Sequence, residues 1–185
     1  PAICNRLDRN TEGLVLAAKD AATLRELNRL IRENRIQKTY LCVLTATPPK
    51  QTDILHAYHW KDAKTNTVTI SDHPKAGYRE IITEYRVLQQ QNGLCLVEIT
   101  LHTGRPHQIR AHMAHIHAPL AGDSKYGDRR KNESLHLKHQ LLCAYQLQFH
   151  PEADSCLAYL NGKTVTAPLP EFVSRFFPAF SNRAL

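Results

Sequence analysis

One short stretch near the start of the chain combines a carboxylate with two arginines. Residues 5–13 read NRLDRNTEG, which places Asp8 between Arg6 and Arg9 and leads into an apolar segment at 14–18. Nearby guanidinium groups favour the charged form of a carboxylate, and a carboxylate kept anionic can act as a nucleophile or a base. The pattern fits a reactive group at the mouth of a strand, and it also fits a surface loop with ordinary ion pairs.

Two more residues suited to chemistry lie in segments with regular patterning. Tyr40 falls in a predicted strand, where its ring could stack on a planar ligand and its hydroxyl relay a proton, or where it could simply fill the core. Arg110 follows Ile109 in a predicted helix, at the edge of the apolar face, from which it can reach inward. Surface packing or a phosphate contact is the alternative role for Arg110.

Four histidines crowd into one short segment and raise the question of a metal site. They are His107, His112, His115 and His117, of which His112 and His115 can share a helix face. The zinc-binding pattern H-E-x-x-H is absent, and no carboxylate partner has the required spacing. We therefore expect no metal, although a metal hydrolase is the more remote alternative.

The charge of the chain points to a polyanionic partner. Its formal net charge is +7 and its sequence pI about 9.3. Segment 101–139 holds seven lysines and arginines, three acidic residues and seven of the eleven histidines. A basic excess of this kind attracts nucleic acid before membrane when no amphipathic basic helix or long apolar stretch is present. Contacts to phosphates are expected on this side, and a merely solvated basic face is the alternative.

The periodicity predicts more strands than helices. The expected helices are 21–34, capped by Asp20, 106–116 and 171–177. The expected strands are 14–18, 37–44, two short strands within 52–72, a hairpin of 79–88 with 94–102, a strand at 141–149, and a hairpin of 156–160 with 163–167. This pattern indicates an α+β fold with a mixed, mostly antiparallel β-sheet and flanking helices.

Length and cysteine use indicate one domain in a reducing compartment. The 185 residues suit a single domain spanning 1–185. The five cysteines have no C-x-x-C spacing, and Cys42, Cys95 and Cys143 lie in apolar runs, as expected of small core residues. We expect a cytoplasmic, monomeric protein with no membrane segment.

Three groups of residues, in order along the chain, resemble the signatures of the RluA-type pseudouridine synthase family. Residues 5–13 resemble its H-R-L-D-x-x-T-S-G, and residues 38–40 its K-x-Y. The stretch TGRPHQIR (103–110), with HAPLAGD (117–123) and YGD (126–128), is similar to its long T-G-R-x-H-Q-I-R…H-P-L-x-G-D…Y-G signature. Three signatures in the same order are far more specific than one.

The resemblance implies the pseudouridine synthase fold and isomerisation of a specific uridine in ribosomal or transfer RNA, with no cofactor. It implies that Asp8 is the catalytic aspartate, that Tyr40 is the active-site tyrosine and that Arg110 pairs with the carboxylate. RNA contacts are expected from Arg6, Arg9, Arg105 and His107.

The chain departs from the family pattern at three points. Asn5 stands where the family has His, and Glu12, where it has Ser, adds a negative charge close to Asp8. The family also has several tens of residues before this motif, so the chain is expected to be an N-terminally truncated catalytic domain with an unpaired sheet edge. The alternative function is a non-catalytic RNA-binding module on the same fold.

Overall fold

A computed structural model describes residues 1–180, and its centre is one large β-sheet. The strand order is β10-β9-β4-β8-β7-β5-β6, and β2 also pairs with β9. Every pairing is antiparallel except that of β2 with β9. The strands are β2 (Glu12–Gly13), β4 (Ile36–Leu44), β5 (Thr52–Asp62), β6 (Thr67–Ser71), β7 (Arg79–Gln91), β8 (Leu94–Leu101), β9 (Leu142–Phe149) and β10 (Thr164–Thr166), beside a separate pair of β1 (Ala2–Ile3) and β3 (Ala17–Ala18).

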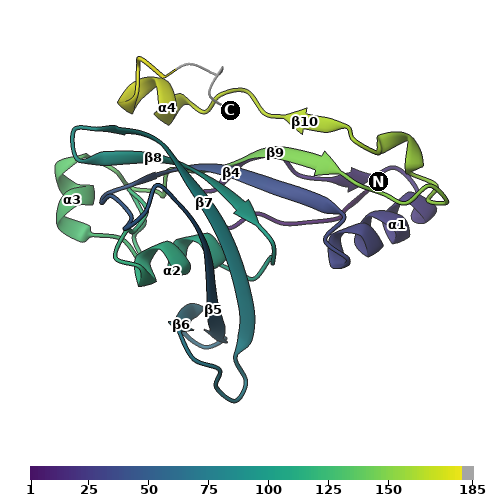
Figure 1. Ribbon diagram of the computed structural model, residues 1–185, viewed down its shortest axis with the longest axis horizontal. Helices are drawn as coiled ribbons and strands as arrows, with labels where there is room; N and C mark the ends of the chain where they lie inside the picture. Colours follow the sequence, from purple (N-terminus) through teal and green to yellow (C-terminus); the bar gives the residue numbers. More distant parts are fainter. Residues whose placement is uncertain (181–185) are drawn as a thin grey trace.

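Helices cover both faces of this sheet (Figure 1). They are α1 (Ala21–Arg32), α2 (Gln108–His115), α3 (Arg129–Ser134) and α4 (Glu171–Phe176), with a 3₁₀ helix η1 at Ala158–Leu160. In Figure 1, α4 lies above the sheet and α2 below it, and the strands β5 and β6 descend as an arm beside α2. The expected α+β fold with a mixed, mostly antiparallel sheet is confirmed.

The central strand β4 is buried on both of its faces. Because side chains alternate along a strand, Tyr40, Cys42 and Leu44 join the core cluster beneath α2, whereas Leu41 and Val43 join the cluster beneath α4. The phenol of Tyr40 is thus held by a strand that cannot shift without disturbing two cores.

Helix α1 begins as its sequence predicts. The Asp20 carboxylate accepts a hydrogen bond from the Thr23 amide at 2.8 Å, which satisfies a free N–H of the first turn. Leu27 and Leu30 are fully buried against Phe149 at the end of β9.

Most of the expected elements are confirmed, two are wrong, and one helix begins later than expected. The segment 14–18 is not a strand of the main sheet, since only Ala17 and Ala18 pair, and they do so with β1. The segment 156–160 forms the 3₁₀ turn η1 instead of a hairpin, and β10 pairs with β9. The helix expected from Pro106 begins at Gln108, because His107 adopts a left-handed conformation with φ of 53°.

The arm is longer than its weak sequence pattern suggested. Its two strands β5 and β6 occupy most of the segment 52–72, where two short strands were expected. Among the described residues, no helix is long and apolar enough to cross a membrane.

The β2 pairing fixes the stretch that carries Asp8. Gly13 has a φ of +110°, and a Cβ at this position would lie 2.2 Å from the Ala144 carbonyl oxygen. Only glycine tolerates both conditions. The chain therefore passes directly against β9, and the preceding residues 5–11 line the same cleft as Lys38 and Tyr40 of β4.

Candidate active site

One cleft of about 680 Å³ is lined by the stretch 5–11, by Lys38 and Tyr40 of β4, and by the segment 104–110. Asp8, Tyr40 and Arg110, which are far apart in the sequence, all line it. Eight lysines and arginines are among the described lining residues, with Asp8 as the single carboxylate: Arg6, Arg9, Lys38, Lys61, Arg105, Arg110, Lys125 and Lys138. The cleft is therefore strongly basic and open to an anionic ligand.

Asp8 and Arg110 form an ion pair inside this cleft. Nη1 of Arg110 lies 3.5 Å from Oδ2 of Asp8, and the two side chains are 8% and 22% exposed. The carboxylate is thus reachable from the cleft while its positive partner is almost enclosed. This is the contact expected from the sequence for Arg110.

Tyr40 faces the same space with its phenol protonated. Burial, and then the nearby Asp8 carboxylate, raise the pKa of Tyr40 to about 12. The register of β4 against β9 shifts between Thr39 and Tyr40, which is a β-bulge at the end of the strand that lines the cleft. Lys38, two residues earlier on the same face, also lines the cleft, and burial lowers its pKa.

A buried aspartate holds Arg110 from behind. Nε of Arg110 lies 2.6 Å from Oδ2 of Asp123, and Nη2 lies 3.1 Å from Oδ1. Burial alone would raise the pKa of Asp123, but its hydrogen bonds to Arg110 and to backbone amides hold that pKa below its usual value. The Tyr126 ring packs 5.3 Å from the Arg110 guanidinium.

Sequence reasoning did not assign Asp123 and Tyr126 to the site. Both fall in the segments HAPLAGD and YGD, to which the sequence analysis gave no role beyond the family resemblance. The signal that could have identified Asp123 is a lone carboxylate within an otherwise apolar and glycine-containing segment, since such a group needs a charged partner when it is buried.

The loop before α2 is fixed by a glutamine. Gln108 accepts hydrogen bonds from the Arg105 amide at 3.0 Å and from the Thr103 hydroxyl at 2.9 Å, and it donates to Thr83 on β7. Arg105 and His107 are held at the cleft as a result. Burial lowers the pKa of His107, with Asp8 acting in the opposite direction.

Arg6 and Arg9 line the cleft, but no ion pair among the described residues joins either of them to Asp8. The arginine in contact with Asp8 comes from α2 instead. Gln140 anchors the stretch by donating to the Arg9 carbonyl at 2.6 Å. The two flanking arginines are therefore left facing the cleft, where an anionic ligand can reach them.

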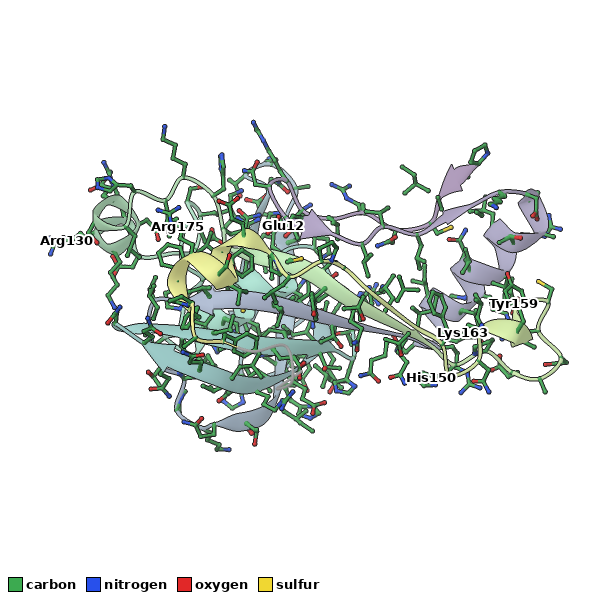
Figure 2. All side chains as sticks on the ribbon, turned by 90° about the horizontal axis from the view of Figure 1, so that it is seen from above. Glu12, Arg130, His150, Tyr159, Lys163 and Arg175 are labelled. Carbon is green, nitrogen blue, oxygen red and sulfur yellow. The ribbon has the colours of Figure 1, made fainter. Side chains whose placement is uncertain are left out.

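Glu12 interacts away from the cleft. It lies on β2, seen from above in Figure 2, where partial burial and then the Glu171 carboxylate of α4 raise its pKa. Asn5, the other departure from the family pattern, accepts a hydrogen bond from the Leu16 amide at 2.7 Å, so it shapes the loop.

The histidine segment is dispersed over different partners. His107 Nδ1 lies 2.8 Å from the Tyr126 hydroxyl, His112 Nδ1 lies 2.9 Å from the Thr83 hydroxyl, and His115 Nε2 lies 2.7 Å from Asp72. Within residues 1–180, no group of three or more histidines, cysteines and acidic residues is arranged to hold a metal ion.

The fold identifies the class of protein. It superposes on the structure titled Human RNA Pseudouridylate Synthase Domain Containing 1 with a TM-score of 0.75, covering 94% of this chain and 71% of that one. The identity of 23% limits this likeness to the fold, which is that of the pseudouridine synthases.

The sequence comparisons identify the family. Residues 1–115 match the family described as RNA pseudouridylate synthase. An uncharacterized RNA pseudouridine synthase of Chloroflexus aurantiacus is 34% identical over 100% of this chain and 55% of its own length, and the ribosomal large subunit pseudouridine synthase C of Buchnera aphidicola is 32% identical over 90% and 52%. The chain belongs to the RNA pseudouridylate synthase family, of the RluA type. It spans about half the length of these relatives.

Proposed function

We propose that this protein isomerises a uridine of RNA to pseudouridine, with Asp8 as the catalytic carboxylate. The observation that supports this most is the ion pair of Asp8 and Arg110 in a basic cleft that Tyr40 also lines. Relatives named as ribosomal large subunit enzymes favour ribosomal RNA over transfer RNA as the substrate.

The reaction balances without any added group. The bond from N1 of uracil to C1′ of ribose breaks, the base turns, and a bond from C5 to the same C1′ forms. N1 gains a proton and C5 loses one, so no atom or electron is gained or lost overall. The protein must therefore supply a reactive carboxylate, groups that move protons, and a site that holds the loose base.

The three central side chains have complementary tasks. Asp8, with its carboxylate partly open to the cleft, supplies the anionic oxygen at the sugar or base. The guanidinium of Arg110 balances the negative charge of the Asp8 carboxylate. Tyr40, whose raised pKa keeps the phenol protonated at neutral pH, offers a ring against which uracil can stack and a hydroxyl that can relay a proton.

The remaining basic groups suit the RNA backbone. A base inside a helix must leave its stack before it can enter the cleft, at a cost of a few kcal/mol. Arg6, Arg9, Arg105 and His107 face the cleft and can offset this cost by contacts to phosphates or to the vacated space. They line the same cleft as Asp8, as contacts around one everted nucleotide require.

The decisive test is the release of tritium from C5 of uridine. RNA from cells that lack the gene, labelled at C5, is incubated with the purified full-length protein. The wild type is expected to release tritium, and Asp8→Asn to release none while it still binds the RNA. Asp154→Asn, a change at an exposed carboxylate outside the cleft, is the matched control and should match the wild type.

The same experiment distinguishes an enzyme from the alternative, a non-catalytic RNA-binding module. A wild-type protein that binds RNA but releases no tritium from any cellular RNA would be a non-catalytic binding module. Release that persists in Asp8→Asn would exclude Asp8 as the catalytic group.

A further inference from the structure

The guanidinium of Arg110 is shared unequally between two carboxylates. Two of its nitrogens contact Asp123, at 2.6 and 3.1 Å, whereas only Nη1 faces Asp8, at 3.5 Å. Paired N–H donors on one carboxylate are the strongest arrangement available to arginine. Arg110 is therefore anchored on Asp123, and its contact with Asp8 is the weaker one.

Asp123 is itself fixed on all sides. Its side chain is fully buried, and Oδ1 accepts hydrogen bonds from the amides of Lys125 and Tyr126. The preceding Gly122, with a φ of +79°, lies so close to the His139 carbonyl that a Cβ would overlap it. The carboxylate cannot move toward the cleft, so it holds the guanidinium at a set distance from Asp8.

The two carboxylate oxygens of Asp123 have different hydrogen-bond donors. Oδ1 serves the loop amides and Nη2 of Arg110, whereas Oδ2 serves Nε of Arg110 alone. The Tyr126 ring covers the guanidinium. Nη1 is thus the one nitrogen of Arg110 that is directed at Asp8.

We propose that Asp123 is a positioning residue that occupies two of the three nitrogens of Arg110. The negative charge of Asp8 is then balanced through one long contact with the third nitrogen. The remaining lone pairs of the Asp8 carboxylate stay available for the substrate. Freed from Asp123, Arg110 could swing onto Asp8 with two parallel hydrogen bonds. Such a pair would tie up the oxygens that must react. This inference deepens the proposed function and rests on it for its effect on turnover.

Asp123→Asn removes the grip of Asp123 on Arg110, called the clamp below, with little change to the loop that carries Asp123. The amide oxygen of Asn can still accept from the Lys125 and Tyr126 amides, which directs its NH₂ group at Nε of Arg110, donor against donor. We expect kcat for tritium release to fall by about tenfold or more, with KM for RNA changed by less than about threefold. A change in KM as large as the fall in kcat, or an unchanged kcat, would overturn the proposal.

A double-mutant cycle separates positioning from general damage. If Asp123 acts through Arg110, the variant with both Asp123→Asn and Arg110→Met should have the kcat of Arg110→Met alone. Losses that multiply would show that Asp123 acts on the fold instead. Each protein is assayed below its melting temperature, and Asp154→Asn serves as the control.

A spectroscopic readout does not depend on turnover. In protein with ¹⁵N-labelled arginine, the Nε–H of Arg110 should give a signal protected from solvent exchange in the wild type and in Asp8→Asn, and this signal should be lost in Asp123→Asn. The opposite pattern, loss in Asp8→Asn and persistence in Asp123→Asn, would overturn the inference. A wild type with the expected signal but no tritium release would refute the proposed function and leave the clamp intact.

Discussion

At the scale of single residues, the cleft controls protonation through burial. Tyr40 is 9% exposed and close to Asp8, so ionising its phenol would place a second negative charge in a poorly hydrated space. Its hydroxyl is consequently a donor or relay near neutral pH, and it cannot act as a preformed phenolate base.

Tyr40→Phe should separate the ring from its hydroxyl. The ring remains for stacking, so RNA affinity should change by less than about twofold, whereas single-turnover tritium release should fall by about a hundredfold if the hydroxyl moves a proton. Tyr159→Phe, at a tyrosine that is 67% exposed on η1, is the matched control. Full activity in Tyr40→Phe would leave stacking as the sole role of this side chain.

At the scale of elements, α2 is joined to β7 by polar groups as well as by packing. Gln108 and His112 both bond Thr83, which is fully buried. Burial lowers the pKa of His112 to about 4, so the folded protein holds this imidazole neutral. The helix that carries Arg110 therefore depends on a histidine that must stay uncharged.

The pH dependence of stability should show this histidine. Its pKa in the unfolded chain is about 6.5, so below that pH the unfolded state binds a proton that the folded state refuses. Stability is complete above about pH 6.5 and falls as the pH drops toward 4. Between pH 7 and 5 the loss attributable to His112 is about 2 kcal/mol.

Urea unfolding of wild type and His112→Asn at both pH values measures this loss. The asparagine can keep a hydrogen bond to Thr83 but does not titrate. Between pH 7 and pH 5, the free energy of unfolding should therefore fall by about 2 kcal/mol less in the variant than in the wild type. An equal decrease in both proteins would show that His112 is protonated in the folded state.

At the scale of the whole molecule, basic side chains lie both in the cleft and outside it. The lining of the cleft is basic, and α3 extends this charge away from it, with Arg130 projecting at the end of the molecule opposite Tyr159 (Figure 2). Lys163 lies outside the cleft lining, toward the Tyr159 end. RNA binding should therefore depend on where a cation lies as well as on how many there are.

A charge-removal pair tests this distribution. Arg105→Gln should weaken RNA binding and reduce the slope of log K against log salt by about 0.7, the value for one phosphate contact on a single strand. Lys163→Gln removes the same charge outside the cleft and should leave the slope within about 0.2 of the wild type. Equal effects of the two variants would indicate attraction by net charge alone. Binding is measured by fluorescence anisotropy across a salt series.

The sequence predicted those elements whose patterns are local. The 79–88 and 94–102 hairpin, the Asp20 cap and the inward reach of Arg110 from the edge of an apolar helix face all follow from neighbouring residues. Cys42, Cys95 and Cys143 are buried, as their apolar runs indicated. The segments 14–18 and 156–160 were misassigned, because only Ala17 and Ala18 of the first segment find a partner strand, in β1, and the second segment contains the 3₁₀ helix η1.

The motif residues, their order and the excess of basic charge were determined by the sequence itself, since these are properties of residue types and spacing. Which arginine meets Asp8 was decided by the tertiary structure. Arg6 and Arg9 are neighbours along the chain, yet the contact comes from Arg110, about a hundred residues away, because the fold brings the stretch 5–11 and the segment 104–110 to the same cleft. The role of Asp123 likewise depends on burial, which turns an unremarkable loop carboxylate into the anchor of a guanidinium.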